Sequence, residues 1–209
     1  MIIKIFEDPK IIAKIQTKLP QLFQLAELDN SRDGKLGMEI GSARERILIA
    51  LLIHQFGSEN IVTKIPITQN KTDVIVFNKQ VSIKTVTGKK IIGVKLIWTV
   101  DAQKSLEFIN NYKPECDILF AHINWNNDGG MYFISKETQT EILTKFGKEF
   151  YFKLPKQGTN PREVEITNHA ISELIKHKNT KSIQIKWIRS KNENYTPYDR
   201  WIELWTEEN

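Results

Sequence analysis

The sequence predicts a single α/β domain, spanning residues 1–209, in which a central mixed β-sheet is flanked by helices. A chain of 209 residues with 40% hydrophobic content is long enough to bury one sizeable core. Its first quarter has apolar residues at helical spacing, and the next segment changes to β-branched runs separated by short polar turns. Helices and strands then alternate, which is typical of domains built on a mixed sheet.

The N-terminal part of the chain is expected to hold two helices. The first covers residues 8–28, and Pro20 is expected to break it, because proline lacks the amide hydrogen that a helix interior uses. Residues 30–41 contain three glycines and predict a loop. The second helix covers about residues 42–55 and ends before Gly57, which suits a C-terminal cap. The apolar positions of the first helix are Ile11, Ile12, Ile15, Leu19, Leu22 and Leu25.

Strands dominate the next part of the prediction. They are expected at residues 60–67, 73–77, 81–87 and 91–100, as a meander with short polar turns. A short helix at 102–112 and a strand pair at 116–125 and 129–135 complete this region.

The C-terminal part of the chain is expected to be mainly helical. Helices are predicted at about 136–146 and 167–178, with a basic loop at 153–167 and a strand at 182–189. A final helix carries Trp201 and Trp205 on one face, where they can serve the core or a dimer contact.

The charge of the chain permits a polyanionic partner. The net charge is +5, and the segment from Asn60 to Val100 has seven lysines but a single acid, Asp73. A codon bias that favours Lys, Ile and Asn would also produce this excess. There is no apolar run near 18 residues and no secretion signal at the N-terminus, and Cys116 has no second cysteine to pair with. We therefore expect a cytoplasmic protein without a membrane partner.

The stretch "KTDVIVFNKQVSIKTV", residues 71–86, predicts a β-hairpin. A two-residue turn at Asn78-Lys79 would place Asp73 directly opposite Lys84, with Ser82 on the same face and the valines toward the core. Two interpretations remain open at this point. The pair can be an exposed ion pair worth roughly 0.2–1 kcal/mol, or it can be part of a metal-dependent nuclease site.

The hairpin resembles the active-site motif of the PD-(D/E)xK nuclease superfamily. Thr72-Asp73 stands in place of Pro-Asp, and Ser82-Ile83-Lys84 stands in place of (D/E)xK. Ser82 departs from this pattern, because a hydroxyl does not supply the second negative charge that a hard divalent cation prefers. Some members of the superfamily draw that acid from the preceding helix, where Glu45 is the candidate. Alternatively, Ser42 and Glu45 form a capping box, and Glu45 only satisfies a backbone amide.

Glu45, Asp73 and Lys84 together resemble the active-site set of the ThaI-type restriction endonucleases. That family also has a methionine shortly before the helical glutamate that inserts into the DNA base stack, and Met38 occupies the corresponding place. The resemblance implies a type II enzyme in which Mg²⁺ is held by Glu45, Asp73 and the Ile83 carbonyl oxygen, while Lys84 assists the attack. It further implies a homodimer that cuts double-stranded DNA at CG/CG to leave blunt ends.

Further DNA contacts are expected from basic side chains. These are Lys35, Arg44 and Arg162. Arg162 lies in the basic loop and can contact either a guanine or a phosphate.

Three alternatives compete with this site. Asp117 in "PECD" and Lys136 in "ISK" imitate the same nuclease motif, although Asp117 opens a very apolar strand. A site of the HNH type on His122 and Asn124 lacks the second histidine that it needs. The chain can also be a DNA-binding protein without catalysis, such as a repressor.

Overall fold

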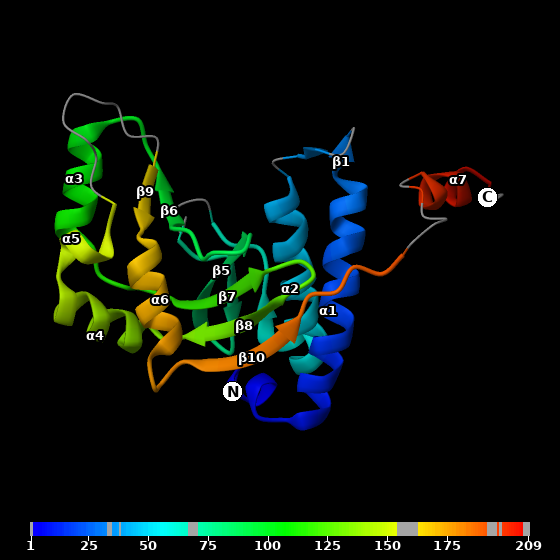
Figure 1. The fold of residues 1–209 in the computed structure, drawn as a ribbon, viewed down its shortest axis with the longest axis horizontal. Helices are drawn as coiled ribbons and strands as arrows, with labels where there is room; N and C mark the ends of the chain where they lie inside the picture. Colours follow the sequence, from blue (N-terminus) through cyan, green and yellow to red (C-terminus); the bar gives the residue numbers. More distant parts are fainter. Residues whose placement is uncertain are drawn as a thin grey trace.

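The computed structural model describes residues 2–32, 35–37, 39–66, 71–153, 163–191, 196 and 198–206. It confirms the α/β class with a central mixed sheet (Figure 1). The helices are η1 (Ile2–Phe6), α1 (Pro9–Asp29), α2 (Ile40–Phe56), η2 (Ser58–Asn60), α3 (Ala102–Asn111), α4 (Lys136–Phe146), α5 (Lys148–Tyr151), α6 (Asn168–Lys176) and α7 (Asp199–Thr206). The strands are β1 (Ser31–Arg32), β2 (Lys35–Leu36), β3 (Ile61–Val62), β4 (Val74–Val76), β5 (Lys79–Thr87), β6 (Val94–Trp98), β7 (Asp117–Ile123), β8 (Asp128–Ile134), β9 (Glu163–Ile166) and β10 (Lys181–Lys186).

Six strands form the central sheet in the order β10-β8-β7-β5-β4-β3. Strand β5 pairs in parallel with β7, and the other neighbours pair antiparallel. Strand β7 is buried along its whole length, as expected for a central strand covered on both faces. Within the described part of the chain, no helix is long and apolar enough to cross a membrane.

The predicted meander was wrong at β6. This strand leaves the central sheet and pairs antiparallel with β9, which lies in the segment predicted as a loop at 153–167. The contact of β6 with β9 is close: a Cβ on Gly93 would lie 2.8 Å from the carbonyl oxygen of Ile166. A β-branched run indicates a strand but not its partner, and β9 is too short to show its alternation clearly.

The predicted break at Pro20 was also wrong, because α1 continues through it. The helix begins after Asp8, whose side chain accepts hydrogen bonds from the amides of Lys10 (2.8 Å) and Ile11 (3.3 Å). Pro20 removes one amide from the ladder, but its ring is buried beside Leu19, and Phe23 one turn later is fully buried. Tertiary packing therefore outweighs the local cost of the proline.

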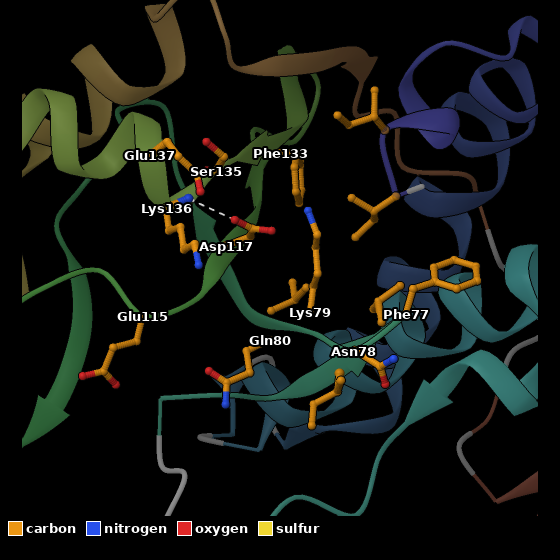
Figure 2. A pocket seen from close by; sticks show the side chains of 15 residues that line it. Phe77, Asn78, Lys79, Gln80, Glu115, Asp117, Phe133, Ser135, Lys136 and Glu137 are labelled. Atoms are coloured by element: carbon orange, nitrogen blue, oxygen red, sulfur yellow. Dashed lines mark hydrogen bonds between the residues drawn. The ribbon is translucent and has the colours of Figure 1, made fainter.

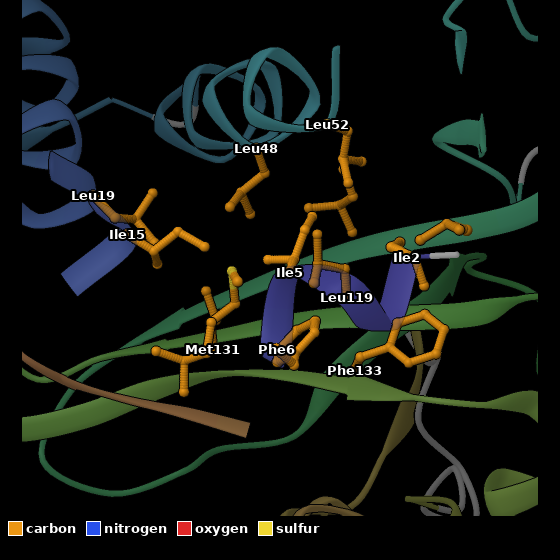
Figure 3. Close-up of a cluster of buried hydrophobic side chains, with 14 of the residues drawn as sticks. Ile2, Ile5, Phe6, Ile15, Leu19, Leu48, Leu52, Leu119, Met131 and Phe133 are labelled. Atoms are coloured by element: carbon orange, nitrogen blue, oxygen red, sulfur yellow. The ribbon is translucent and has the colours of Figure 1, made fainter. Parts of the chain in front are cut away.

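The sheet separates two hydrophobic clusters. One face packs against η1, α1 and α2, and its members include Ile5, Phe6, Leu48, Leu52 and Met131 (Figure 3). The other face packs against α3–α6 and the β6–β9 pair. Helix α2 is thus held on the same face of the sheet as α1, next to the β4–β5 hairpin.

A buried ionic cluster joins α1 to α2. The Glu27 carboxylate, 3% exposed, accepts hydrogen bonds from Arg44 of α2, from the Trp125 indole (2.9 Å) and from Arg189 (2.5 Å). Trp125 follows β7 and Arg189 follows β10, so one carboxylate connects four parts of the fold. The Arg189 guanidinium also lies over the Trp125 ring, 4.2 Å from its centroid.

Replacing Glu27 with glutamine is expected to lower the free energy of unfolding by about 3–5 kcal/mol, because Arg44 would remain buried without a counter-charge. Urea denaturation followed by far-ultraviolet circular dichroism measures the change. The matched control is Glu7→Gln, which removes an exposed pair with Lys181 (3.8 Å) and is expected to change little. An equal effect of the two substitutions would contradict a structural role for Glu27.

Candidate active site

The β4–β5 hairpin turns one residue earlier than the sequence predicts. Phe77 and Asn78 have positive φ angles of 48° and 64°, as in a type I′ turn, and Val74 pairs with Val81. The Phe77 ring packs edge-on against the Phe56 ring, with 5.2 Å between the two ring centroids. This contact favours the observed turn over the predicted Asn78-Lys79 turn. Asp73 therefore lies beside Ser82, and Lys84 is two residues further along β5. The partner of each β4 residue on β5 thus differs from the predicted partner by two positions. Because side chains alternate along a strand, the same side chains stay on each face of the sheet.

The Asp73 carboxylate is held by groups of β5. Its Oδ2 atom accepts hydrogen bonds from the Ser82 hydroxyl (3.0 Å) and from the Ile83 amide (2.6 Å). The Lys84 Nζ atom lies 3.6 Å from the same oxygen. Asp73 and Lys84 are partly exposed, and Ser82 is buried. The departure from the (D/E)xK motif thus places a hydrogen-bond donor next to Asp73.

Glu45 does not form the capping box that was the alternative. Helix α2 begins at Ile40 with Glu39 at the N-cap, so Ser42 lies inside the helix. The pKa of Glu45 is raised, first by its burial and then by the charge of Asp73, while Lys84 opposes the shift. Helix α2 packs with β5 in one hydrophobic cluster, and the charges of Asp73 and Lys84 both act on Glu45. Glu45 therefore belongs to the same region of the structure as Asp73 and Lys84.

The donor set fits a hard divalent cation. Two carboxylates whose charges disfavour each other face the same region, and a bound cation would relieve that repulsion. Among the described residues there is no cluster of three or more His, Cys, Asp or Glu side chains suited to a metal. The Ile83 carbonyl oxygen is the backbone candidate for a third ligand, because Ile83 lies between Ser82 and Lys84 and its amide donates to Asp73.

The expected DNA contact by Arg44 does not agree with its position. Its side chain is buried, with 5% exposed, and is paired with Glu27, so the guanidinium is not available to a phosphate. Burial also lowers the pKa of Arg44, against the opposing effect of Glu27. Of the other predicted contacts, Met38, Arg162 and the side chain of Lys35 lie outside what the structure describes.

Two structural features near Lys84 were not predicted from the sequence. Lys71 pairs with Glu115 (3.0 Å) and lies over the rings of Phe108 (5.3 Å) and Tyr112 (5.9 Å). A groove of about 370 Å³ also runs from Lys84 along β5 to β6. The spacing of Phe108 and Tyr112 on α3 was the one signal for the first feature, and nothing local indicated the second.

The competing acid, Asp117, serves the start of a helix. Figure 2 shows its carboxylate accepting a hydrogen bond from the Lys136 amide (2.9 Å), in a cavity of about 610 Å³. Lys136 is the first residue of α4, so this bond satisfies an amide without a partner inside the helix. Among the described residues, no ion pair joins Asp117 to the Lys136 side chain. Burial raises the pKa of Asp117.

Comparison with known proteins decides the family. The family described as "Restriction endonuclease ThaI" matches residues 5–207, which is nearly the whole chain. The chain belongs to the ThaI restriction endonuclease family. A solved structure described as "Restriction endonuclease in complex with substrate DNA" is 50% identical, covers 98% of each chain and has a TM-score of 0.88. No curated protein sequence matches the chain.

Membership in the ThaI family establishes the class of activity. The protein is a site-specific deoxyribonuclease of the type II restriction enzymes, with the fold of a restriction endonuclease. The sequence left open a repressor without catalysis, but the family that matches is one of restriction endonucleases.

The two candidate acids can be separated by substitution. Asp73→Asn is expected to reduce plasmid cleavage by more than about 100-fold. Loss of a group that only orients a metal ligand already costs about 10–100-fold, and Asp73 is expected to be a ligand itself. Asp117→Asn is the matched control, and its cleavage rate is expected to stay close to that of the parent protein, since the amide oxygen still accepts the Lys136 bond. Loss of cleavage in Asp117→Asn alone would move the site to that cavity.

Proposed function

We propose that the protein is a Mg²⁺-dependent type II restriction endonuclease that cuts double-stranded DNA at CG/CG as a homodimer. The catalytic part is supported by the position of the Lys84 Nζ atom, 3.6 Å from Asp73, and by the effect of both charges on Glu45. The target sequence, the blunt ends and the dimer rest on the resemblance to ThaI-type enzymes. Because the substrate is DNA, a cytoplasmic location is part of the proposal.

Three groups of the chain would hold the metal ion. They are the Glu45 and Asp73 carboxylates and the Ile83 carbonyl oxygen. Bound Mg²⁺ lowers the pKa of a coordinated water and neutralises charge that develops on the phosphate. The Ser82 hydroxyl and the Ile83 amide keep the Asp73 carboxylate oriented before substrate arrives.

Lys84 would act on the attacking water and on the phosphate. Its ammonium group orients the water and stabilises the negative charge of the pentavalent phosphorus. The water oxygen would lose a proton to solvent and form the new bond to phosphorus, while the bond from phosphorus to the 3′ oxygen of the preceding nucleotide breaks and that oxygen takes up a proton from solvent. The products are a 5′-phosphate and a 3′-hydroxyl.

The substrate would lie over the region around Lys84. The groove between β5 and β6 begins at Lys84 and continues past Lys95 to Trp98, which is 68% exposed. Met38 is proposed as the wedge in the base stack, and Lys35 and Arg162 as further DNA contacts. Arg44 is no longer proposed, because Glu27 already binds it.

Substitution of the catalytic set should separate turnover from binding. Lys84→Ala is expected to lower the single-turnover cleavage rate by about 10²–10³-fold, since it removes electrostatic stabilisation of the transition state. Its affinity for a CGCG duplex in Ca²⁺, measured by gel shift, should change little. Glu45→Gln should lose cleavage as well, and Glu39→Gln, at the N-cap of the same helix, is the matched control. Full cleavage by Glu45→Gln would exclude Glu45 from the site.

The complete proposal is tested on two plasmids that differ only in one CGCG site. Cleavage is expected at that site in Mg²⁺ and not in EDTA, with blunt ends in the sequenced products. Discrete fragments from the plasmid without the site would contradict the target. Intact DNA with every divalent ion would contradict the catalytic assignment.

A further inference from the structure

We propose that helix α7 of one protein chain docks into a groove between α1 and α2 of a second copy, so that two chains exchange their C-terminal helices. This inference rests on the homodimer in the proposed function and names the contact that forms it. Two complementary surfaces carry it: an amphipathic helix whose described apolar side chains are exposed, and an apolar groove with a basic rim.

Helix α7 presents apolar side chains to solvent. Tyr198, Ile202 and Trp205 are 68%, 57% and 90% exposed. Their spacing of four and three residues places them on one face of the helix, with Asp199 and Glu203 on another. Neither hydrophobic cluster of the described residues includes a side chain of α7, and Figure 1 shows the helix beyond α1, apart from the sheet. An apolar face of this kind on an otherwise polar surface is typical of an interaction site.

The groove lies between the outer faces of α1 and α2. It has a volume of about 410 Å³. Its apolar lining consists of Ile11, Ile15, Leu19, Leu22, Ile47 and Leu51. Leu22 is 43% exposed, although it lies between two buried turns of α1. A strip of apolar residues at helical spacing along two helices is the surface that receives an amphipathic helix.

The charges of the two surfaces are opposite. Lys14, Lys18 and His54 also line the groove, the Lys14 Nζ atom lies 2.8 Å from His54 Nε2, and none of the described lining residues is acidic. The chain from residue 199 onward has four acids (Asp199, Glu203 and the pair at 207–208) and one arginine, giving a net charge of −3. This complementarity favours an acidic helix as the occupant. The mainly apolar lining, with isoleucine and leucine side chains, suits a helix better than the polar backbone of DNA.

The occupant is a second copy because the described side chains of α7 belong to neither hydrophobic cluster of their own chain, and α7 lies apart from the sheet (Figure 1). The segment that precedes it is tied to α1, where Gln24 bonds with the backbone of Ser190 at 2.7 and 2.8 Å. From that point α7 extends outward although an apolar groove is present on the same chain. Two identical chains can satisfy both surfaces twice by reciprocal exchange, which gives a closed two-fold dimer.

Cross-linking between two co-expressed chains tests the contact. One chain carries Leu22→Cys and one tag, the other carries Trp205→Cys and a second tag, and both carry Cys116→Ser. A short flexible bismaleimide should join the two chains into a doubly tagged product of twice 24.3 kDa. Val62→Cys, at an exposed position of the edge strand β3, replaces Leu22→Cys as the matched control and should give no such product.

The outcomes distinguish the contact from the dimer itself. Light scattering of the parent protein, with and without a CGCG duplex, reports the oligomeric state independently. A parent dimer without a Leu22–Trp205 product would overturn the docking while leaving the proposed function intact. A product within one chain, made when both cysteines are on the same molecule, would show that α7 binds its own groove and would also overturn the exchange.

A second pair of variants tests the energetic role of the contact. Ile202→Glu with Trp205→Glu should convert the dimer to monomers in light scattering, because both side chains are exposed in the single chain and their loss leaves its core intact. Val62→Glu, at an exposed apolar position of β3 outside both α7 and the groove, is the matched control and should remain dimeric. An unchanged dimer in the double variant would count against the exchange.

Discussion

The buried Glu27 carboxylate fixes α2, the helix that carries the proposed catalytic acid Glu45. It binds Arg44, which is the residue immediately before Glu45. Successive residues of an α-helix point about 100° apart, so fixing Arg44 toward α1 fixes the direction of Glu45. That direction is toward the hairpin that carries Asp73. The contact between Arg44 and Glu27 therefore sets the rotation of α2, and the position of the proposed catalytic acid depends on it.

The second constraint is the way in which β5 holds Asp73. Two donors of β5, the Ser82 hydroxyl and the Ile83 amide, bind the same carboxylate oxygen. A carboxylate at position 82 would instead stand against Asp73 Oδ2 and repel it. In the proposed site the second acid comes from α2, so position 82 can supply a donor, and the serine is consistent with that site.

Local patterns in the sequence predicted many of the helices and strands. They did not predict which strands pair or which distant side chains contact one another. Helix α2 and the hairpin follow from periodicity, whereas Glu45, Asp73 and Lys84 were chosen by a motif resemblance and stay a proposal. The register was wrong because the turn depends on Phe77 packing against Phe56, a contact 21 residues apart. Arg44 was assigned to DNA because its partner Glu27 lies on another helix. The pairing of β6 with β9 joins segments about 70 residues apart, for which neither strand gives a local signal.

Helix α2 connects the proposed dimer contact to the active site. Glu45 lies in its N-terminal half, and Ile47 and Leu51 of the α1–α2 groove follow on the same rigid helix. The neighbouring face of the helix, at Leu48 and Leu52, is fixed in the core. A helix packed on two faces can shift only as a unit. Occupation of the groove would therefore restrict the motion of α2 and, with it, the position of Glu45, so that assembly of the dimer and order in the catalytic site are coupled through one helix.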